Sequence, residues 1–124
     1  MKKTCLIQLI VVLLTLSLWN CKKNEPEPEP FLITNFSVTV VASTAAANMY
    51  RVNYDVTNRS TRRYTITGRP RFSAVFTAAA TDGTTYTTTD GLPELDPGEK
   101  QPRTTFVDTK GKDATIGAEI RQTP

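Results

Sequence analysis

The cysteine at position 21 has the surroundings that point most directly to chemistry. Cys21 follows an apolar run from Cys5 to Trp19 and precedes two lysines and an alternating run of glutamate and proline. A thiol in such a position can be acylated, and each buried methylene of an acyl chain contributes about 0.8 kcal/mol to membrane binding. The other interpretation is a free or disulfide-forming thiol. The chain has two cysteines, and the second one, Cys5, lies in the segment that processing before Cys21 would remove.

A cluster of arginines is the second group of residues that suggests binding chemistry. Guanidinium groups on paired strands and their connecting loop would form a basic patch for phosphate, an acidic glycan or lipopolysaccharide. The alternative is a set of solvated strand surfaces whose charge nearby carboxylates neutralise. The cluster consists of Arg51 and the five residues of our candidate basic patch, Arg59, Arg62, Arg63, Arg69 and Arg71. The neutralising carboxylates would be Asp82, Asp90, Glu94, Asp96 and Glu99.

Other kinds of chemistry find little support in the residue types. The chain has no histidine, and no cysteine follows Cys21, which excludes a histidine base and a Cys/His zinc site. Four carboxylates between residues 90 and 99 could bind calcium through oxygens, but they lack EF-hand spacing. The many threonines are typical of exposed strand surfaces, and only a flat threonine face would suggest a hydroxyl array for ice or sugar. We therefore expect no enzyme activity, no metal and no cofactor.

The residues before Cys21 are predicted to direct the chain to a membrane. Lys2 and Lys3 precede the apolar run, which as a helix would be about 22 Å long and so shorter than the roughly 30 Å hydrocarbon core. Length and charge favour a secretory signal at residues 1–20 over an uncleaved anchor helix. Removal of that signal lowers the formal charge of the 124-residue chain from +3 to +1, so its basic character gives no reason to expect a nucleic-acid partner.

The segment from Leu18 to Lys23 resembles the lipobox of bacterial lipoproteins, in the loose form common among Bacteroidetes. Trp19 and Asn20 depart from the strict pattern, which has small residues before the cysteine. The resemblance implies diacylglycerol on Cys21, cleavage before it and acylation of the new amino terminus. It places the protein in the bacterial cell envelope, as an outer-membrane lipoprotein.

Residues 21–30 are predicted to form a tether between the lipid and a folded domain. Alternating glutamate and proline cannot form a helix, because each proline removes an amide and restricts the residue before it. In the polyproline II conformation, at about 3.1 Å per residue, residues 22–30 would span roughly 28 Å. Acidic residues soon after the cysteine also resemble the surface-export signal of Bacteroidetes lipoproteins. A periplasmic and a surface-exposed position therefore both stay open.

Residues 31–124 have the composition of an all-β domain. Threonine, valine, tyrosine and phenylalanine alternate with turn residues at short intervals, which predicts an antiparallel immunoglobulin-like β-sandwich of about seven strands. The clearest strand is 50–57, where Tyr50, Val52, Tyr54 and Val56 share one face. We expect further strands over 32–40, 62–67, 72–80, 85–88, 104–109 and 115–121, with a loop at 43–48. The domain has no disulfide, so burial alone must stabilise it.

Three turns and one ambiguous position complete the expected fold. Asp82-Gly83 predicts a type I′ hairpin turn, which needs positive φ at both central residues. Asp90-Gly91 predicts a second turn, and residues 95–99 a third. In the strand over 104–109, either Phe106 or Val107 faces the core.

The segment from Tyr54 to Ser60, with Asp82-Gly83, Tyr86 and the turn at 95–99, is similar to small immunoglobulin-like modules of bacterial envelope proteins. These include the DUF4352 and FxLYD-type domains. The resemblance implies a fold and brings no catalytic or ligand residues. We expect a lipid-anchored, non-catalytic binding or structural accessory module, with another envelope protein or an acidic glycan as its partner. The alternative is an inhibitor or ligand-sequestering lipoprotein that uses an exposed loop, 58–63, or the basic patch.

Replacing Cys21 with serine tests the anchor. We expect Cys21→Ser to leave the signal uncleaved and to abolish incorporation of radiolabelled palmitate, because the thiol is the acylated group. The parallel substitution Cys5→Ser is the control and should retain both cleavage of the signal and incorporation of palmitate. Labelling and membrane partitioning of Cys21→Ser at the level of the parent would contradict the prediction.

Overall fold

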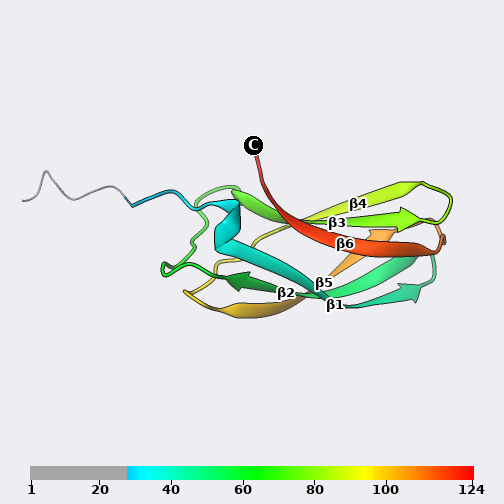
Figure 1. The fold of residues 1–124 in the computed structure, drawn as a ribbon, viewed down its shortest axis with the longest axis horizontal. Coiled ribbons are helices and arrows are strands. Elements are labelled where there is room, and N and C mark those ends of the chain that lie inside the picture. Colours follow the sequence, from blue (N-terminus) through cyan, green and yellow to red (C-terminus); the bar gives the residue numbers. More distant parts are fainter. Residues whose placement is uncertain (1–27) are drawn as a thin grey trace, which may run out of the picture. The chain divides into compact units, whose positions relative to one another are not determined.

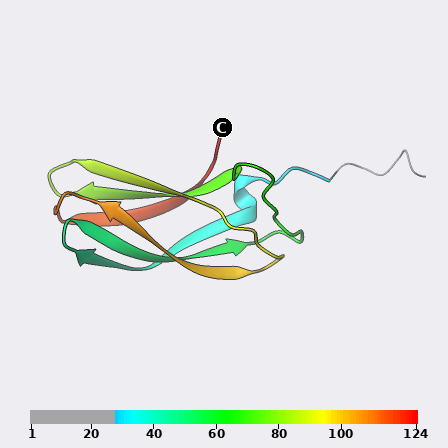
Figure 2. The same cartoon turned by 180° about the vertical axis from the view of Figure 1, so that it is seen from behind.

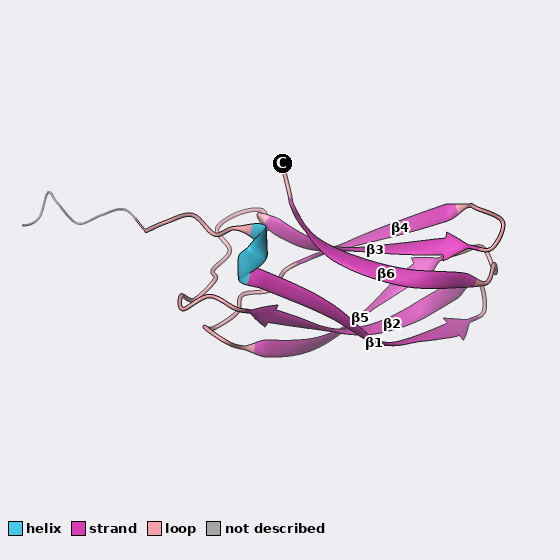
Figure 3. Ribbon diagram, in the orientation of Figure 1, coloured by secondary structure: helices cyan, strands magenta, loops and turns pink. Residues whose placement is uncertain are grey.

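The computed structural model describes residues 28–124, so the predicted signal, Cys21 and most of the tether lie outside the described residues. Residues 31–124 form one unit, whose regular secondary structure is almost entirely strand (Figure 1, Figure 3). A short 3-10 helix, η1 (Ile33–Asn35), precedes the first strand. The strands are β1 (Phe36–Ala46), β2 (Met49–Asn58), β3 (Phe72–Ala80), β4 (Thr85–Gly91), β5 (Lys100–Asp108) and β6 (Ala114–Gln122). No helix within residues 28–124 has the length and apolar character needed to cross a membrane.

The six strands form two three-stranded antiparallel sheets that pack as a sandwich. One sheet has the order β1-β2-β5 and the other the order β4-β3-β6. Figure 2 shows the same two layers from behind. The predicted all-β antiparallel sandwich is confirmed, but it has six strands where the sequence suggested about seven.

Alternation along the strands builds the core between the sheets. The predicted inward face of β2 is confirmed, because Val52, Tyr54 and Val56 are almost fully buried and Tyr50 packs against the same core. From β3, in the middle of the other sheet, Phe72 and Phe76 enter the core with the alanines between and beyond them. Each large apolar side chain buried in this way contributes about 1.5–3 kcal/mol.

The predicted strand at 62–67 is wrong, although two alternating residues of the segment do face the core. The segment belongs to the connection between β2 and β3, and only Tyr64 pairs, in an isolated antiparallel bridge with Leu95. Tyr64 is buried and Ile66 packs against the core. A tyrosine and an isoleucine two residues apart thus bury as a strand would, but their backbone has no neighbouring strand to extend the ladder.

The first hairpin is longer than expected and begins later. β1 continues into the segment at 43–48, which was expected to be a loop, and pairs with β2 up to Ala46 and Met49, so that only residues 47–48 form the turn. At the other end, Leu32 is 60% exposed and precedes η1, so the predicted strand at 32–40 begins only at Phe36. A register shift between Val40 and Ala42 makes Val41 a bulge, which the alternation could not indicate.

The turn predictions are partly correct. Asp82-Gly83 does join β3 and β4 as a hairpin, but positive φ occurs at Gly83 and not at Asp82. Two successive residues of positive φ occur between β5 and β6, at Lys110-Gly111. The turn at 95–99 is confirmed by the bond from Glu99 N to Asp96 O at 3.0 Å.

Asp90-Gly91 is not a turn but the end of β4. Glycine is needed there because Pro70 packs onto it, and a Cβ on Gly91 would lie 2.9 Å from Pro70 Cγ. The Asp-Gly pair therefore marks a close approach of two segments.

A polar cluster links the sheets where β4 lies beside β5. Tyr54 from β2 packs on Phe76 from β3 at 4.6 Å between ring centroids, and its hydroxyl donates a hydrogen bond to Asp90 of β4. Arg103 of β5 donates through Nε to the same hydroxyl at 3.3 Å and lies 3.8 Å from Asp90. Burial and the Asp90 carboxylate raise the pKa of Tyr54 to about 12.

The raised pKa of Tyr54 predicts a loss of stability at high pH. The contribution is complete below pH 10, where tyrosine is protonated in both states, and it declines as pH rises through the folded-state pKa of about 12. Urea unfolding of the wild type and of Tyr54→Phe between pH 8 and pH 12 measures it. We expect Tyr54→Phe to cost about 1–2 kcal/mol at pH 8 and the difference to shrink above pH 10. A difference independent of pH would contradict the assignment.

Candidate functional site

The five residues of the candidate basic patch all lie on one connection, residues 59–71 between β2 and β3, here called the arginine loop. The loop contains these five arginines and no acidic residue. It occupies the end of the sandwich at which the chain enters the domain (Figure 1). Arg51 lies apart from them, on the outward side of β2, so the structure separates it from the patch. Binding by the patch stays a prediction.

A buried asparagine holds the first half of the arginine loop in place. Asn58 has no exposed surface, and its Nδ2 donates to the carbonyl oxygens of Arg62 at 2.7 Å and Leu95 at 3.1 Å. Its Oδ1 accepts from the amide and the hydroxyl of Ser60, at 3.0 and 2.7 Å. Its backbone amide donates to the carbonyl oxygen of Glu99, in the turn between β4 and β5, at 3.0 Å. One side chain therefore connects the end of β2, the loop and the neighbouring turn.

The arginines of the loop differ in their partners. Arg63 forms ion pairs with Asp96 and Glu94, and these exposed carboxylates hold its pKa above the ordinary value. The Arg62 guanidinium lies over the ring of Phe31, 4.5 Å from the centroid. Within residues 28–124, Arg59, Arg69 and Arg71 are exposed and have no carboxylate at ion-pairing distance.

An aromatic cluster joins the arginine loop to the point where the chain enters. Its members are Phe31, Phe36, Tyr64 and Phe72. Phe31 stacks on Phe36 at 5.6 Å and meets Tyr64 edge to face at 5.4 Å. Directly after Phe31, Leu32 and Ile33 are 60% and 45% exposed. The same end of the domain therefore presents arginines and two large apolar side chains.

The carboxylates considered for calcium all have other partners. Asp90 accepts from Tyr54, Glu94 and Asp96 pair with Arg63, and Glu99 accepts from the Asp96 amide at 2.7 Å. Within the described part of the chain, no group of three or more metal-ligating side chains converges. These carboxylates support the fold and the loop.

The outward side of the sheet β1-β2-β5, here called the outer face, is a second candidate site. Phe106 lies there, 51% exposed, directly across from Arg51 of β2, while Val107 is buried. Met49, 38% exposed, shares the outward side of β2 with Arg51. The sequence left the orientation of Phe106 and Val107 open, because two adjacent apolar residues fit an alternating strand in either register.

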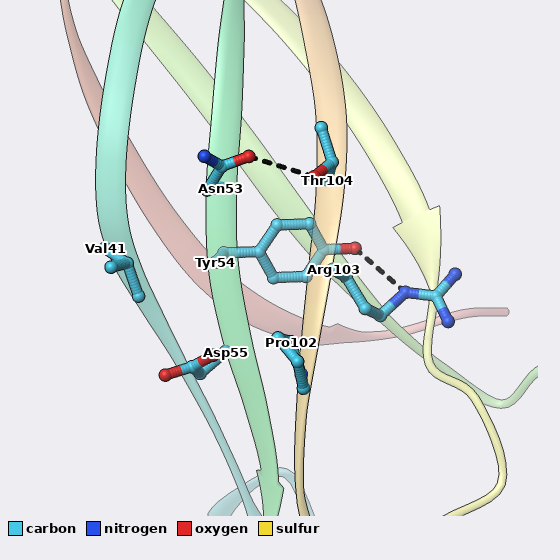
Figure 4. Close-up of a pocket in the computed structure, with 7 residues that line it drawn as sticks. All are labelled: Val41, Asn53, Tyr54, Asp55, Pro102, Arg103 and Thr104. Carbon is cyan, nitrogen blue, oxygen red and sulfur yellow. Dashed lines mark hydrogen bonds between the residues drawn. The ribbon is translucent and has the colours of Figure 1, made fainter.

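Val41 forms one side of a shallow hollow on the outer face. The hollow has a volume of about 320 Å³ and is open to solvent. Figure 4 shows Val41, Asn53, Asp55 and Thr104 around it, with the Asn53 side chain accepting a hydrogen bond from Thr104 at 2.9 Å. Pro102 also borders it and removes one amide from β5, an edge strand of the sheet. The hollow is too open to enclose a small molecule.

The opposite sheet gathers threonines on its outward side. They are Thr85, Thr87 and Thr89 of β4, Thr77 of β3 and Thr115 of β6. Their neighbours on that side include Ala79 and Gly117, and a hollow of about 270 Å³ lies beside Gly117. The threonines therefore share one side of the sheet, the arrangement whose existence the sequence could not decide. The same side also carries a charged pair, Glu119 and Arg121 of β6, so the threonines do not form an unbroken array of hydroxyls.

Comparison of the chain with protein-family models, curated proteins and solved structures finds no match. The functional conclusion therefore depends on the arginine loop and the outer face.

Truncating Asn58 tests whether it holds the arginine loop. We expect Asn58→Ala to lower the free energy of unfolding by about 2–3 kcal/mol, because several buried or partly buried groups lose their hydrogen bonds at once. The control is Asn53→Ala, which removes one exposed bond and should cost no more than about 0.5 kcal/mol. Urea denaturation measures both. Equal effects of the two substitutions would show that Asn58 has no special role.

Proposed function

We propose that this chain is a lipid-anchored, non-catalytic module of the bacterial cell envelope that binds another envelope protein through the outer face. In this proposal the domain is an immunoglobulin-like accessory module, and the lipid on Cys21 holds it at the outer membrane. The domain would contribute a stable binding surface, because the backbone of a sandwich of paired strands changes little on binding.

The observation that carries the proposal is the composition of the outer face. Three of the five large apolar side chains that are exposed within residues 31–124 lie on it: Val41, Met49 and Phe106. Arg51 pairs directly with Phe106 across the strands. Aromatic residues, methionine and arginine are the residue types enriched in protein interfaces, where an aromatic side chain often supplies the anchor.

The shape of the surface favours a protein over a small molecule. Small-molecule sites are concave and bury most of their ligand. The hollow beside Val41 is open, and its polar side chains, Asn53 and Asp55, stand at the surface. A partner with a projecting side chain would fill such a hollow and cover Phe106 at the same time.

A second candidate function is inhibition through the exposed loop at 58–63. The Asn58 hydrogen bonds support it, because they fix the loop while Arg59 and Thr61 stay exposed. A loop that is rigid before binding loses little conformational entropy when it inserts into a target. The partner would then contact Thr61 and not Phe106.

Photo-cross-linking in intact cells separates the two functions. We expect a cross-linker in place of Phe106 to give a discrete protein adduct, and cross-linkers in place of Thr61 and Thr87 to give none. Purified domain added in excess should compete for the adduct. The Phe106→Ser domain should compete at least about tenfold less well, as loss of an aromatic anchor predicts. An adduct from position 61 alone would replace the proposed interface with the inhibitor function.

A further inference from the structure

We propose that the end of the domain at which the chain enters is itself a membrane-binding surface. In this arrangement, arginines of the arginine loop contact the phosphates of anionic lipid headgroups, and Leu32 and Ile33 insert among them. The orientation relies on the proposed anchor at Cys21, but the surface belongs to the folded domain and can be tested without the lipid.

The position of the chain's entry determines which end of the domain is tethered to the bilayer. The tether is covalently joined to Phe31, which is held in the aromatic cluster at that end. Nine residues lie between Cys21 and Phe31, so the ten Cα-to-Cα steps of even a fully extended chain span at most about 35 Å. A lipid on Cys21 therefore confines this end of the domain to the neighbourhood of the headgroups and raises its effective concentration there.

Charge distinguishes this end from the opposite one. The exposed side chains of Arg59, Arg69 and Arg71 have no ion-pair partner within residues 28–124. At the opposite end, both lysines are paired, Lys110 with Asp108 at 2.7 Å and Lys112 with Asp82 at 2.6 Å. Of the two ends, the one that contains the arginine loop therefore offers unpaired cations to a phosphate, which arginine binds through two parallel hydrogen bonds.

Exposed apolar residues distinguish it as well. Leu32, directly before η1, and Ile33, its first residue, are exposed and follow Phe31, whose ring lies under the Arg62 guanidinium. Large apolar side chains beside basic ones are the combination by which peripheral proteins bind membranes, since burial of apolar area adds to the attraction of anionic lipids. An acidic glycan would use the arginines but would give Leu32 and Ile33 no apolar phase to enter.

Vesicle binding by a lipid-free form tests the proposal. The protein is residues 21–124 with Cys21→Ser, which contains the whole folded unit. We expect it to cosediment with vesicles of phosphatidylcholine mixed with phosphatidylglycerol and not with phosphatidylcholine alone. Binding should weaken as salt rises from about 0.1 M to about 1 M, because the Debye length falls to about 3 Å. Soluble heparin and inorganic phosphate serve as lipid-free anions.

Substitutions locate the surface. Combined replacement of Arg59, Arg69 and Arg71 by serine should lower vesicle partitioning about 100-fold, since each basic residue near the surface contributes about a factor of five. Arg51→Ser is the matched control, an exposed arginine on the outer face, and should retain binding within about twofold. Equal losses in the two variants would overturn the assignment.

Insertion can be followed by fluorescence, because the only tryptophan of the chain is Trp19, which this form lacks. The fluorescence emission of a tryptophan introduced as Leu32→Trp should shift to shorter wavelength on anionic vesicles and be quenched by brominated lipids. The emission of Phe106→Trp should show neither change. Binding to heparin but not to vesicles, or quenching at position 106 and not at 32, would overturn the proposal. Either result would leave the anchor at Cys21 untouched, because palmitate labelling tests it separately.

Discussion

The aromatic cluster at the end where the chain enters is the contact on which the other features of this domain depend. Phe36 belongs to one sheet and Phe72 to the other, and their rings lie 5.0 Å apart. Tyr64, from the arginine loop, packs in the same cluster with its ring centroid 4.9 Å from that of Phe36. Phe31, where the chain enters the domain, packs there as well. Without a disulfide, this packing closes the core and fixes where the tether begins. Such aromatic pairs contribute about 0.5–1.5 kcal/mol beyond the burial of their area.

The proposed division of the surface follows from that geometry. If the arginine loop faces the bilayer, the outer face lies on the side of the sandwich and not at its membrane-facing end. Phe106 and Val41 are then accessible to a partner. The two sites use different chemistry: unpaired guanidinium groups and exposed aliphatic residues at the end, and an aromatic, methionine and arginine surface on the sheet. They are also separated along β2, since Arg51 lies seven residues before Asn58, where β2 ends and the arginine loop follows. A short tether and a rigid loop would together limit the orientations in which the outer face is presented.

Alternation predicted the core of this fold better than its strand count. The inward face of β2 follows directly from residues spaced by two, the strand at 72–80 has the predicted bounds, and the strand predicted at 85–88 extends to Gly91. Tyr64 and Ile66 mimic a strand because burial, and not backbone pairing, sets their spacing. Composition also grouped Arg51 with the loop arginines, although a strand residue and a loop residue lie on different surfaces. The bulge at Val41 and the approach of Pro70 to Gly91 depend on contacts between distant segments, which a local pattern does not contain.

Neutron reflectometry of the lipidated protein on a supported anionic bilayer tests the central claim most directly, because it measures the protein and water density along the membrane normal. The proposal predicts that protein density begins at the headgroup layer, with no hydrated gap between them, and that the contact persists at physiological salt. It also predicts that a gap opens when Arg59, Arg69 and Arg71 are replaced by serine. A water layer as thick as the extended tether, about 30 Å, in the wild-type protein would contradict the account.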